Sequence, residues 1–132
     1  MKIVYAYICG DILHEGHLSF LENAKSLGDK LIVGILTDKA VMEKKKRPII
    51  GFKERIRLIS SLKCVDCAVP QNEYAPLENL KTIRPDILIE SSSHIGNKYL
   101  KQIHKVFKGT IIMMPYYPEV SSTSIKNKIR EN

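Results

Sequence analysis

Short runs of apolar, often β-branched residues alternate with amphipathic stretches along all 132 residues of the chain, and this alternation restricts the possible folds more than any other feature. The strand candidates are Lys2–Ile8, Lys30–Leu36, Val65–Val69, Asp86–Ile89 and Thr110–Met114. The second, fourth and fifth are almost entirely apolar, which is typical of strands covered on both faces. Because no linker or repeat interrupts the pattern, it predicts a single α/β domain over residues 1–132.

Between these runs, apolar residues recur with the spacing of helices that cover a sheet. The predicted helices are Leu18–Gly28, Ile56–Leu62, Pro76–Ile83, Asn97–Phe107 and a last one from about Ser121 to the C-terminus. Five parallel strands joined by right-handed crossovers form a doubly wound, Rossmann-like sheet, most simply in the order 3-2-1-4-5. Ligands bind where the winding reverses, so the loops at 9–17, 90–96 and 115–123 are expected to face one crevice.

Charge and composition limit the partners that this chain is expected to have. Lys and Arg number 21 against 14 Asp and Glu, and four of the basic residues form one run, Lys44–Arg47, so an anionic partner is plausible. Arg-Gly-Gly repeats, zinc-finger spacing and an aromatic-rich RNA-binding strand are all missing, which disfavours nucleic acid. No apolar run approaches the roughly 20 residues that span a bilayer, and three cysteines fit a reducing compartment, so we expect a cytoplasmic protein without membrane contact.

The loop after the first predicted strand carries the most unusual residues. His14 and His17 flank Glu15 and Gly16 where a strand passes into a helix, which places two imidazoles beside free backbone N–H groups and a positive helix end. Gly16 has no Cβ, so an anion can approach the backbone closely. This arrangement predicts a phosphate site, whereas either histidine alone would more often be a buried, hydrogen-bonded side chain. The nearby carboxylates do not have a familiar ligand spacing, so no protein-bound metal is expected.

The HEGH run at 14–17 resembles the HxGH signature of the nucleotidyltransferase superfamily. Further runs, in order along nearly the whole chain, resemble the small bacterial and archaeal cytidylyltransferases, including the glycerol-3-phosphate and phosphonate-pathway enzymes. These runs are LGDKLIVGILTD (27–38), KKKRPI (44–49), FKERIRLISSLKCVD (52–66), VPQ (69–71), RPDIL (84–88) and VSSTSIKNKI (120–129). The resemblance implies a homodimeric enzyme that transfers CMP from CTP to a small phosphate or phosphonate, releases pyrophosphate, and uses Mg²⁺ brought by the triphosphate.

The resemblance also implies roles for individual residues. The catalytic residues would be His14, His17, Lys46 and Ser122. The two histidines would donate hydrogen bonds to the phosphates in the transition state, Lys46 would bridge the acceptor and nucleotide phosphates, and Ser122 would help to hold the β- and γ-phosphates. Nucleotide binding falls to Ile8, Cys9, Gly16, Ser91, Ser121 and Thr123. Acceptor binding falls to Lys44, Arg55, Asp11 and Tyr116.

Three departures from the family pattern bear on the substrates. Ile8–Asp11 stands where glycerol-3-phosphate cytidylyltransferases have GTFD, Ser91–His94 replaces an acidic GDDW-like run, and Tyr116 replaces an arginine. These changes predict a short acceptor other than glycerol 3-phosphate, such as 2-hydroxyethylphosphonate. Two alternatives stay open: an ATP-dependent adenylyltransferase resembling archaeal FAD synthetase, since HxGH does not select the base, and a nucleotide-binding module without turnover.

Overall fold

The computed structural model describes residues 1–91 and 97–115, with the side chains of residues 97 and 98 excepted. Its five strands form one parallel sheet in the order β3-β2-β1-β4-β5, which confirms the predicted topology. The strands are β1 Ile3–Ile8, β2 Lys30–Leu36, β3 Cys67–Gln71, β4 Ile87–Ser91 and β5 Thr110–Met114. The helices are α1 Glu15–Lys25, α2 Asp38–Val41, α3 Phe52–Ser60, α4 Leu77–Ile83 and α5 Asn97–Val106.

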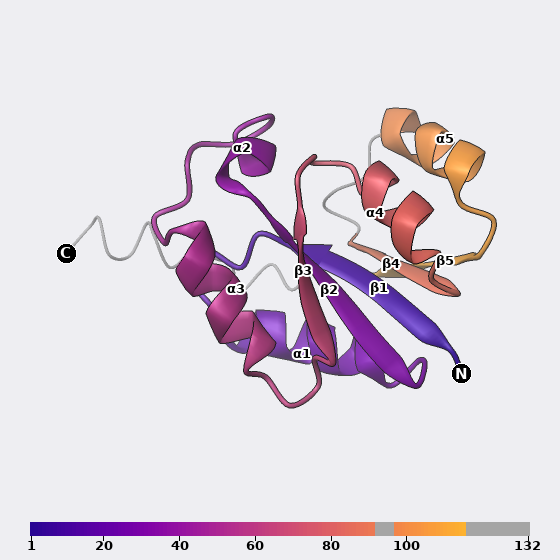
Figure 1. Ribbon diagram of the computed structural model, residues 1–132, viewed down its shortest axis with the longest axis horizontal. Helices are drawn as coiled ribbons and strands as arrows, with labels where there is room; N and C mark the ends of the chain where they lie inside the picture. Colours follow the sequence, from indigo (N-terminus) through magenta and orange to yellow (C-terminus); the bar gives the residue numbers. More distant parts are fainter. Residues whose placement is uncertain (92–96, 116–132) are drawn as a thin grey trace.

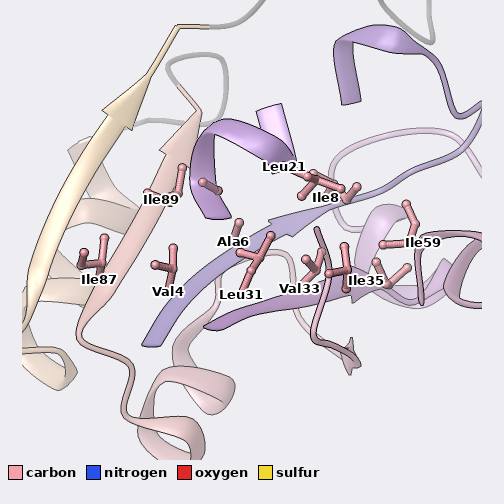
Figure 2. Close-up of a cluster of buried hydrophobic side chains, with 12 residues drawn as sticks. Val4, Ala6, Ile8, Leu21, Leu31, Val33, Ile35, Ile59, Ile87 and Ile89 are labelled. Carbon is pink, nitrogen blue, oxygen red and sulfur yellow. The ribbon is translucent and has the colours of Figure 1, made fainter. Parts of the chain in front are cut away.

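Helices cover both faces of the sheet (Figure 1). On one face, Leu21 and Ala24 of α1 and Ile59 of α3 pack on the inward side chains of β1, β2 and β4, and Figure 2 shows this cluster. On the other face, α2, α4 and α5 pack on Tyr5, Tyr7 and Leu88. Alternate strand residues therefore enter two separate cores, as a doubly wound sheet requires.

Some boundaries differ from those predicted, for local reasons. Strand β3 begins at Cys67 rather than Val65, because the Asp66 carboxylate accepts hydrogen bonds from the Leu31 amide at 2.8 Å and from the Lys25 ammonium at 2.6 Å. Those bonds hold Asp66 in a bend that precedes the strand. Strand β4 runs two residues beyond Ile89, as Glu90 and Ser91 pair with β5. The short helix α2 was not predicted, and the predicted helix from about Ser121 lies outside the described residues.

The winding reverses between β1 and β4, which pair directly in the sheet. Carboxyl ends of parallel strands share one edge, so Ile8 and Ser91 end at the edge where the first turn of α1 begins. Gly10, directly after β1, has a φ of 68°, a left-handed conformation that glycine adopts without strain. In the described part of the chain, no helix is both long and apolar enough to cross a membrane.

Candidate functional site

Two histidines cap the first turn of α1 and bond to each other's backbone. His14 is the N-cap residue, and its Nδ1 atom accepts a hydrogen bond from the Gly16 amide at 2.9 Å. The Nδ1 atom of His17 accepts one from the His14 amide at 3.2 Å. This reciprocal capping box places the two ring centroids 4.0 Å apart.

The capping bonds determine where each ring carries its proton. A nitrogen that accepts a backbone N–H is unprotonated, so the proton of each neutral ring is on Nε2. Burial lowers the pKa of His14, and burial together with the neighbouring His14 ring lowers the pKa of His17 to about 4, against an opposing effect of Asp11. Both rings are therefore neutral Nε2–H donors at pH 7. The Nε2 atom of His14 is buried and has no hydrogen-bond partner among the described residues.

Asp11 joins the loop after β1 to the segment that follows the basic run. Its side chain is 1% exposed, and its two carboxylate oxygens accept the amides of Ile49 and Ile50 at 3.0 Å and 2.8 Å. Asp11 was predicted to bind the acceptor. Its acceptor role stays a prediction, and in the structure both of its oxygens accept backbone N–H groups, so it fixes one end of the basic loop beside the histidine helix.

Arg55 also ties loops together at this edge. Its side chain is fully buried, and it donates to the carbonyls of Ile50, Cys9 and Leu36 at 2.7–2.9 Å and to the Asp38 carboxylate at 2.6 Å. Four of the five N–H groups of a guanidinium are thus occupied by the protein. The predicted contact of Arg55 with a phosphate stays a prediction, and the geometry shows a side chain that positions the loops after β1 and β2.

The basic run Lys44–Arg47 follows α2 and is exposed throughout. The Lys44 ammonium lies 5.2 Å from the centre of the Tyr99 ring. Hydrogen bonding to the Tyr99 side chain, together with its charge, raises the pKa of Lys44 above its ordinary value. Arg47 approaches Asp38 at 3.8 Å, at the surface. Lys46, the predicted catalytic lysine, has an exposed side chain, consistent with a cation available to an incoming anion.

The remaining predicted residues fall into two groups. Ile8, Cys9, Gly16 and Ser91 all lie at the carboxyl edge, where β1 and β4 end and α1 begins. Tyr116, Ser121, Ser122 and Thr123 lie outside the described residues. Among the described residues, no three His, Cys, Asp or Glu side chains are grouped so that they could hold a metal ion.

Sequence reasoning missed a buried carboxyl group at the same edge. Glu90, the next-to-last residue of β4, is 2% exposed, and its Oε1 atom accepts a hydrogen bond from the Tyr7 hydroxyl at 2.6 Å. Burial raises the pKa of Glu90 to about 7. The available signal was one acidic residue that directly follows the apolar run Ile87–Ile89. Asp38, the partner of Arg55, was also missed, although it lies just beyond the second strand, after Thr37.

Comparisons with known proteins connect this site to a family. A sequence model of the family described as cytidylyltransferase-like matches residues 9–128. The bifunctional protein HldE of Helicobacter pylori strain HPAG1 is 37% identical over 98% of this chain, and that of Campylobacter fetus is 35% identical over 97%. In both cases the match covers 28% of the relative, so the chain spans little more than a quarter of those proteins.

Solved structures give a similar result. The lipopolysaccharide core biosynthesis protein of Thermoplasma volcanium superposes with a TM-score of 0.80 and 32% identity, over 89% of this chain and 98% of that one. A pantoate-beta-alanine ligase of Francisella tularensis superposes with a TM-score of 0.63 and 21% identity, over 99% of this chain and 70% of that one. The second comparison shows a shared fold.

Proposed function

The chain belongs to the cytidylyltransferase-like family, and we propose that it transfers AMP from ATP to the phosphate group of a small sugar phosphate, with release of pyrophosphate. The observation that carries this proposal is the pair of neutral histidines whose Nε2–H groups are left as donors at the positive end of α1. A pair of N–H donors at a helix N-terminus is suited to the phosphates of a nucleotide.

The relatives guide the choice of both substrates. The sequence resemblance favoured CTP and a short phosphonate, yet the relatives that match 97–98% of this chain bear the name HldE, and a structural relative at 32% identity is named for lipopolysaccharide core biosynthesis. A lipopolysaccharide core is built from sugars, and nucleotide attachment is a usual way to activate a sugar phosphate. These findings support ATP and a sugar phosphate more than CTP and a phosphonate, and CTP stays a prediction.

In the proposed reaction, an oxygen of the acceptor phosphate attacks the α-phosphorus of the triphosphate. A bond forms between that oxygen and phosphorus, the bond to the bridging oxygen of the β-phosphate breaks, and pyrophosphate leaves with the electron pair. The attacking oxygen is already an anion, so no general base is required, and catalysis rests on positioning and on stabilising charge. His14 and His17 donate from Nε2 to the oxygens of the α-phosphate as its charge rearranges.

The other predicted residues have supporting roles in this proposal. Lys46, with Lys44 beside it, neutralises charge between the acceptor phosphate and the nucleotide. Ser121, Ser122 and Thr123 bind the outer phosphates of the nucleotide through their hydroxyl groups. Arg55 and Asp11 hold the loop after β1 and the segment around the basic run, and their buried hydrogen bonds support a positioning role.

Mg²⁺ is expected to enter with the triphosphate, where it neutralises phosphate charge. The nearby carboxylates do not fit a protein cage for this ion, because Asp11 binds two amides and Asp38 binds Arg55. We therefore assign no Mg²⁺ ligand to the described residues.

A product assay tests the proposal. The protein is incubated with Mg²⁺, ATP or CTP, and a panel containing mannose 1-phosphate, glucose 1-phosphate, glycerol 3-phosphate and 2-hydroxyethylphosphonate, and products are identified by mass spectrometry. We expect an adenosine diphosphate-linked sugar as the main product. A cytidine-linked product would return the assignment to a cytidylyltransferase, and binding of a triphosphate without any product would favour the non-catalytic alternative.

A further inference from the structure

Glu90 is a buried acidic residue that the proposed nucleotidyl transfer does not use. It follows Ile87, Leu88 and Ile89 in β4, and its side chain is 2% exposed. Burial of a carboxyl group is costly unless its oxygens find hydrogen-bond partners. A residue that carries this cost at the carboxyl edge of the sheet is a candidate for a functional role.

Only one of the two carboxyl oxygens has a partner in the described part of the chain. The Tyr7 hydroxyl donates to Oε1 at 2.6 Å, and this bond fixes the carboxyl group from the neighbouring strand β1. The Oε2 atom is buried and has no hydrogen-bond partner among the described residues. Since β1 and β4 are the strands at which the winding reverses, this acceptor lies where ligands bind in doubly wound sheets.

Aromatic residues join Glu90 to the basic run on the same face of the sheet. Tyr74 belongs to the buried cluster that contains Tyr7. Burial is the main cause of the raised pKa of Tyr74, and the nearby Glu90 also contributes. The Tyr74 amide donates to the Glu43 carboxylate at 3.0 Å, and its ring lies 6.2 Å from that of Tyr99. Lys44 in turn lies over Tyr99. The Glu90 carboxyl group thus lies near Tyr74, and Lys44 lies over Tyr99, the other member of this tyrosine pair.

We propose that Glu90 is the residue that selects the acceptor, by accepting at Oε2 a hydrogen bond from a hydroxyl group of a polyhydroxylated phosphate whose phosphate faces the Lys44–Arg47 run. This inference rests on the proposed function, since it assigns the sugar end of the acceptor to this position. A hydroxyl group is neutral and satisfies the buried oxygen directly.

Isothermal titration calorimetry with defined probes tests this role without requiring turnover. Mannose 1-phosphate and glucose 1-phosphate carry hydroxyl groups, whereas propyl phosphate has the same charge and none. The wild-type protein should bind at least one sugar phosphate roughly 10- to 100-fold more tightly than propyl phosphate, the range for a hydrogen bond to a charged group. In Glu90→Gln this preference should fall severalfold, because the carboxamide oxygen keeps the Tyr7 hydroxyl and the NH₂ group at the Oε2 position can only donate a neutral hydrogen bond to the ligand, in place of accepting a charge-assisted one.

The matched control is Glu22→Gln, which removes an exposed carboxylate from α1 and should leave the preference unchanged. Wild-type protein without a preference for either sugar phosphate at millimolar concentration would overturn the proposal. The proposal would also be overturned if Glu90→Gln kept the preference for the sugar phosphate, or if it lost affinity for propyl phosphate as much as for the sugar phosphate.

Stability and activity measurements distinguish a binding role of Glu90 from a structural one. A structural role predicts that Glu90→Gln destabilises the protein at pH 8, whereas removal of a buried, incompletely bonded carboxylate should leave its unfolding free energy equal or higher. Destabilisation at pH 8 would therefore count against a binding role. If the protein shows a Glu90-dependent sugar preference but no nucleotidyl transfer, the proposed function is refuted and this inference stands. If it transfers the nucleotide but Glu90→Gln keeps the sugar preference, this inference is refuted and the proposed function stands.

Discussion

The Nη2 atom of Arg55 and the Oδ1 atom of Asp38 lie 2.6 Å apart, and this ion pair joins α3 to the first turn of α2. Arg55 is completely buried, whereas the Asp38 side chain is 27% exposed. The same guanidinium bonds the carbonyls of Cys9 and Leu36, where the loops after β1 and β2 begin. The pair therefore fixes the distance between the histidine loop and the basic run.

Replacement of Arg55 by Ala should lower the free energy of unfolding by about 3 to 5 kcal/mol, because three carbonyls and one carboxylate lose their donor. Urea denaturation measures this change. Arg57→Ala is the control, since Arg57 is exposed on the same helix and its loss should change stability by less than about 0.5 kcal/mol. If Arg55→Ala keeps wild-type stability and only raises the KM for the acceptor, Arg55 contacts substrate after all.

His14→Asn separates helix capping from catalysis. Asparagine is a strong N-cap residue, so its Oδ1 atom should replace the Nδ1 acceptor and keep α1 intact, but it has no equivalent of the Nε2–H donor. We expect kcat to fall roughly 10²- to 10³-fold with little change in nucleotide affinity or thermal stability. Turnover is measured as the rate of pyrophosphate release. His104→Asn, at an exposed histidine of α5, should behave as wild type, and near-normal turnover in His14→Asn would remove His14 from the mechanism.

His17→Ala should be more damaging to the fold than His14→Asn, because it removes both the Nε2–H donor and the acceptor of the His14 amide. A comparable loss of kcat is expected, together with a loss of about 1 kcal/mol in stability from the broken capping box. Chemical denaturation and pyrophosphate release measured on the same preparation give both values. Unchanged stability would show that the capping bond contributes nothing in solution.

Lys46→Ala should reduce kcat/KM for the acceptor by roughly 10²-fold if its ammonium bridges two phosphates in the transition state. Lys46→Arg should retain much of the activity and Lys46→Gln should not, since the role depends on charge. Lys44→Ala is expected to be milder. Lys53→Ala removes an exposed charge from α3 as the control. Equal activity of Lys46→Arg and Lys46→Gln would show that the charge of Lys46 has no catalytic role and that the Lys44–Arg47 run is an ordinary solvated surface.

Glu90 and His17 should give opposite slopes to stability against pH. Glu90 titrates near 4.5 when unfolded and near 7 when folded, so its contribution to the unfolding free energy falls as pH rises through this window. His17 titrates near 6.5 unfolded and near 4 folded, so its contribution rises through that window. These two contributions therefore oppose each other between pH 4.5 and 6.5, and the lowered pKa of His14 adds to that of His17.

Removing the Glu90 carboxyl group leaves the contribution of His17 to the change of unfolding free energy with pH. Glu90→Gln should become more stable as pH rises from 4 to 6.5 and should exceed the wild type at pH 8 by about 1 to 3 kcal/mol. Urea denaturation across pH 4 to 8 measures both curves. Parallel curves for the two proteins would mean that Glu90 titrates normally in the folded state.

The HxGH signature was enough to predict the histidine site, because the residues that build it are adjacent in the chain. Capping is a local interaction, and His14, Gly16 and His17 complete it within one helical turn. Arg55 is different. Nothing in its segment distinguishes a guanidinium that binds phosphate from one that is buried, since its partners at Cys9 and Leu36 are 46 and 19 residues away.

The sequence by itself determined the alternation of strands and helices and hence the parallel sheet in the order 3-2-1-4-5, because hydrophobic periodicity and right-handed crossovers leave few other arrangements. Only the tertiary structure decided which polar residues became buried partners. Tyr7 and Glu90 are 83 residues apart and meet only because β1 and β4 pair side by side. Burial and long-range pairing depend on the whole folded chain, and they turn an ordinary glutamate into a buried carboxyl group whose Oε1 atom is bonded by Tyr7 and whose Oε2 atom has no hydrogen-bond partner in the described part of the chain.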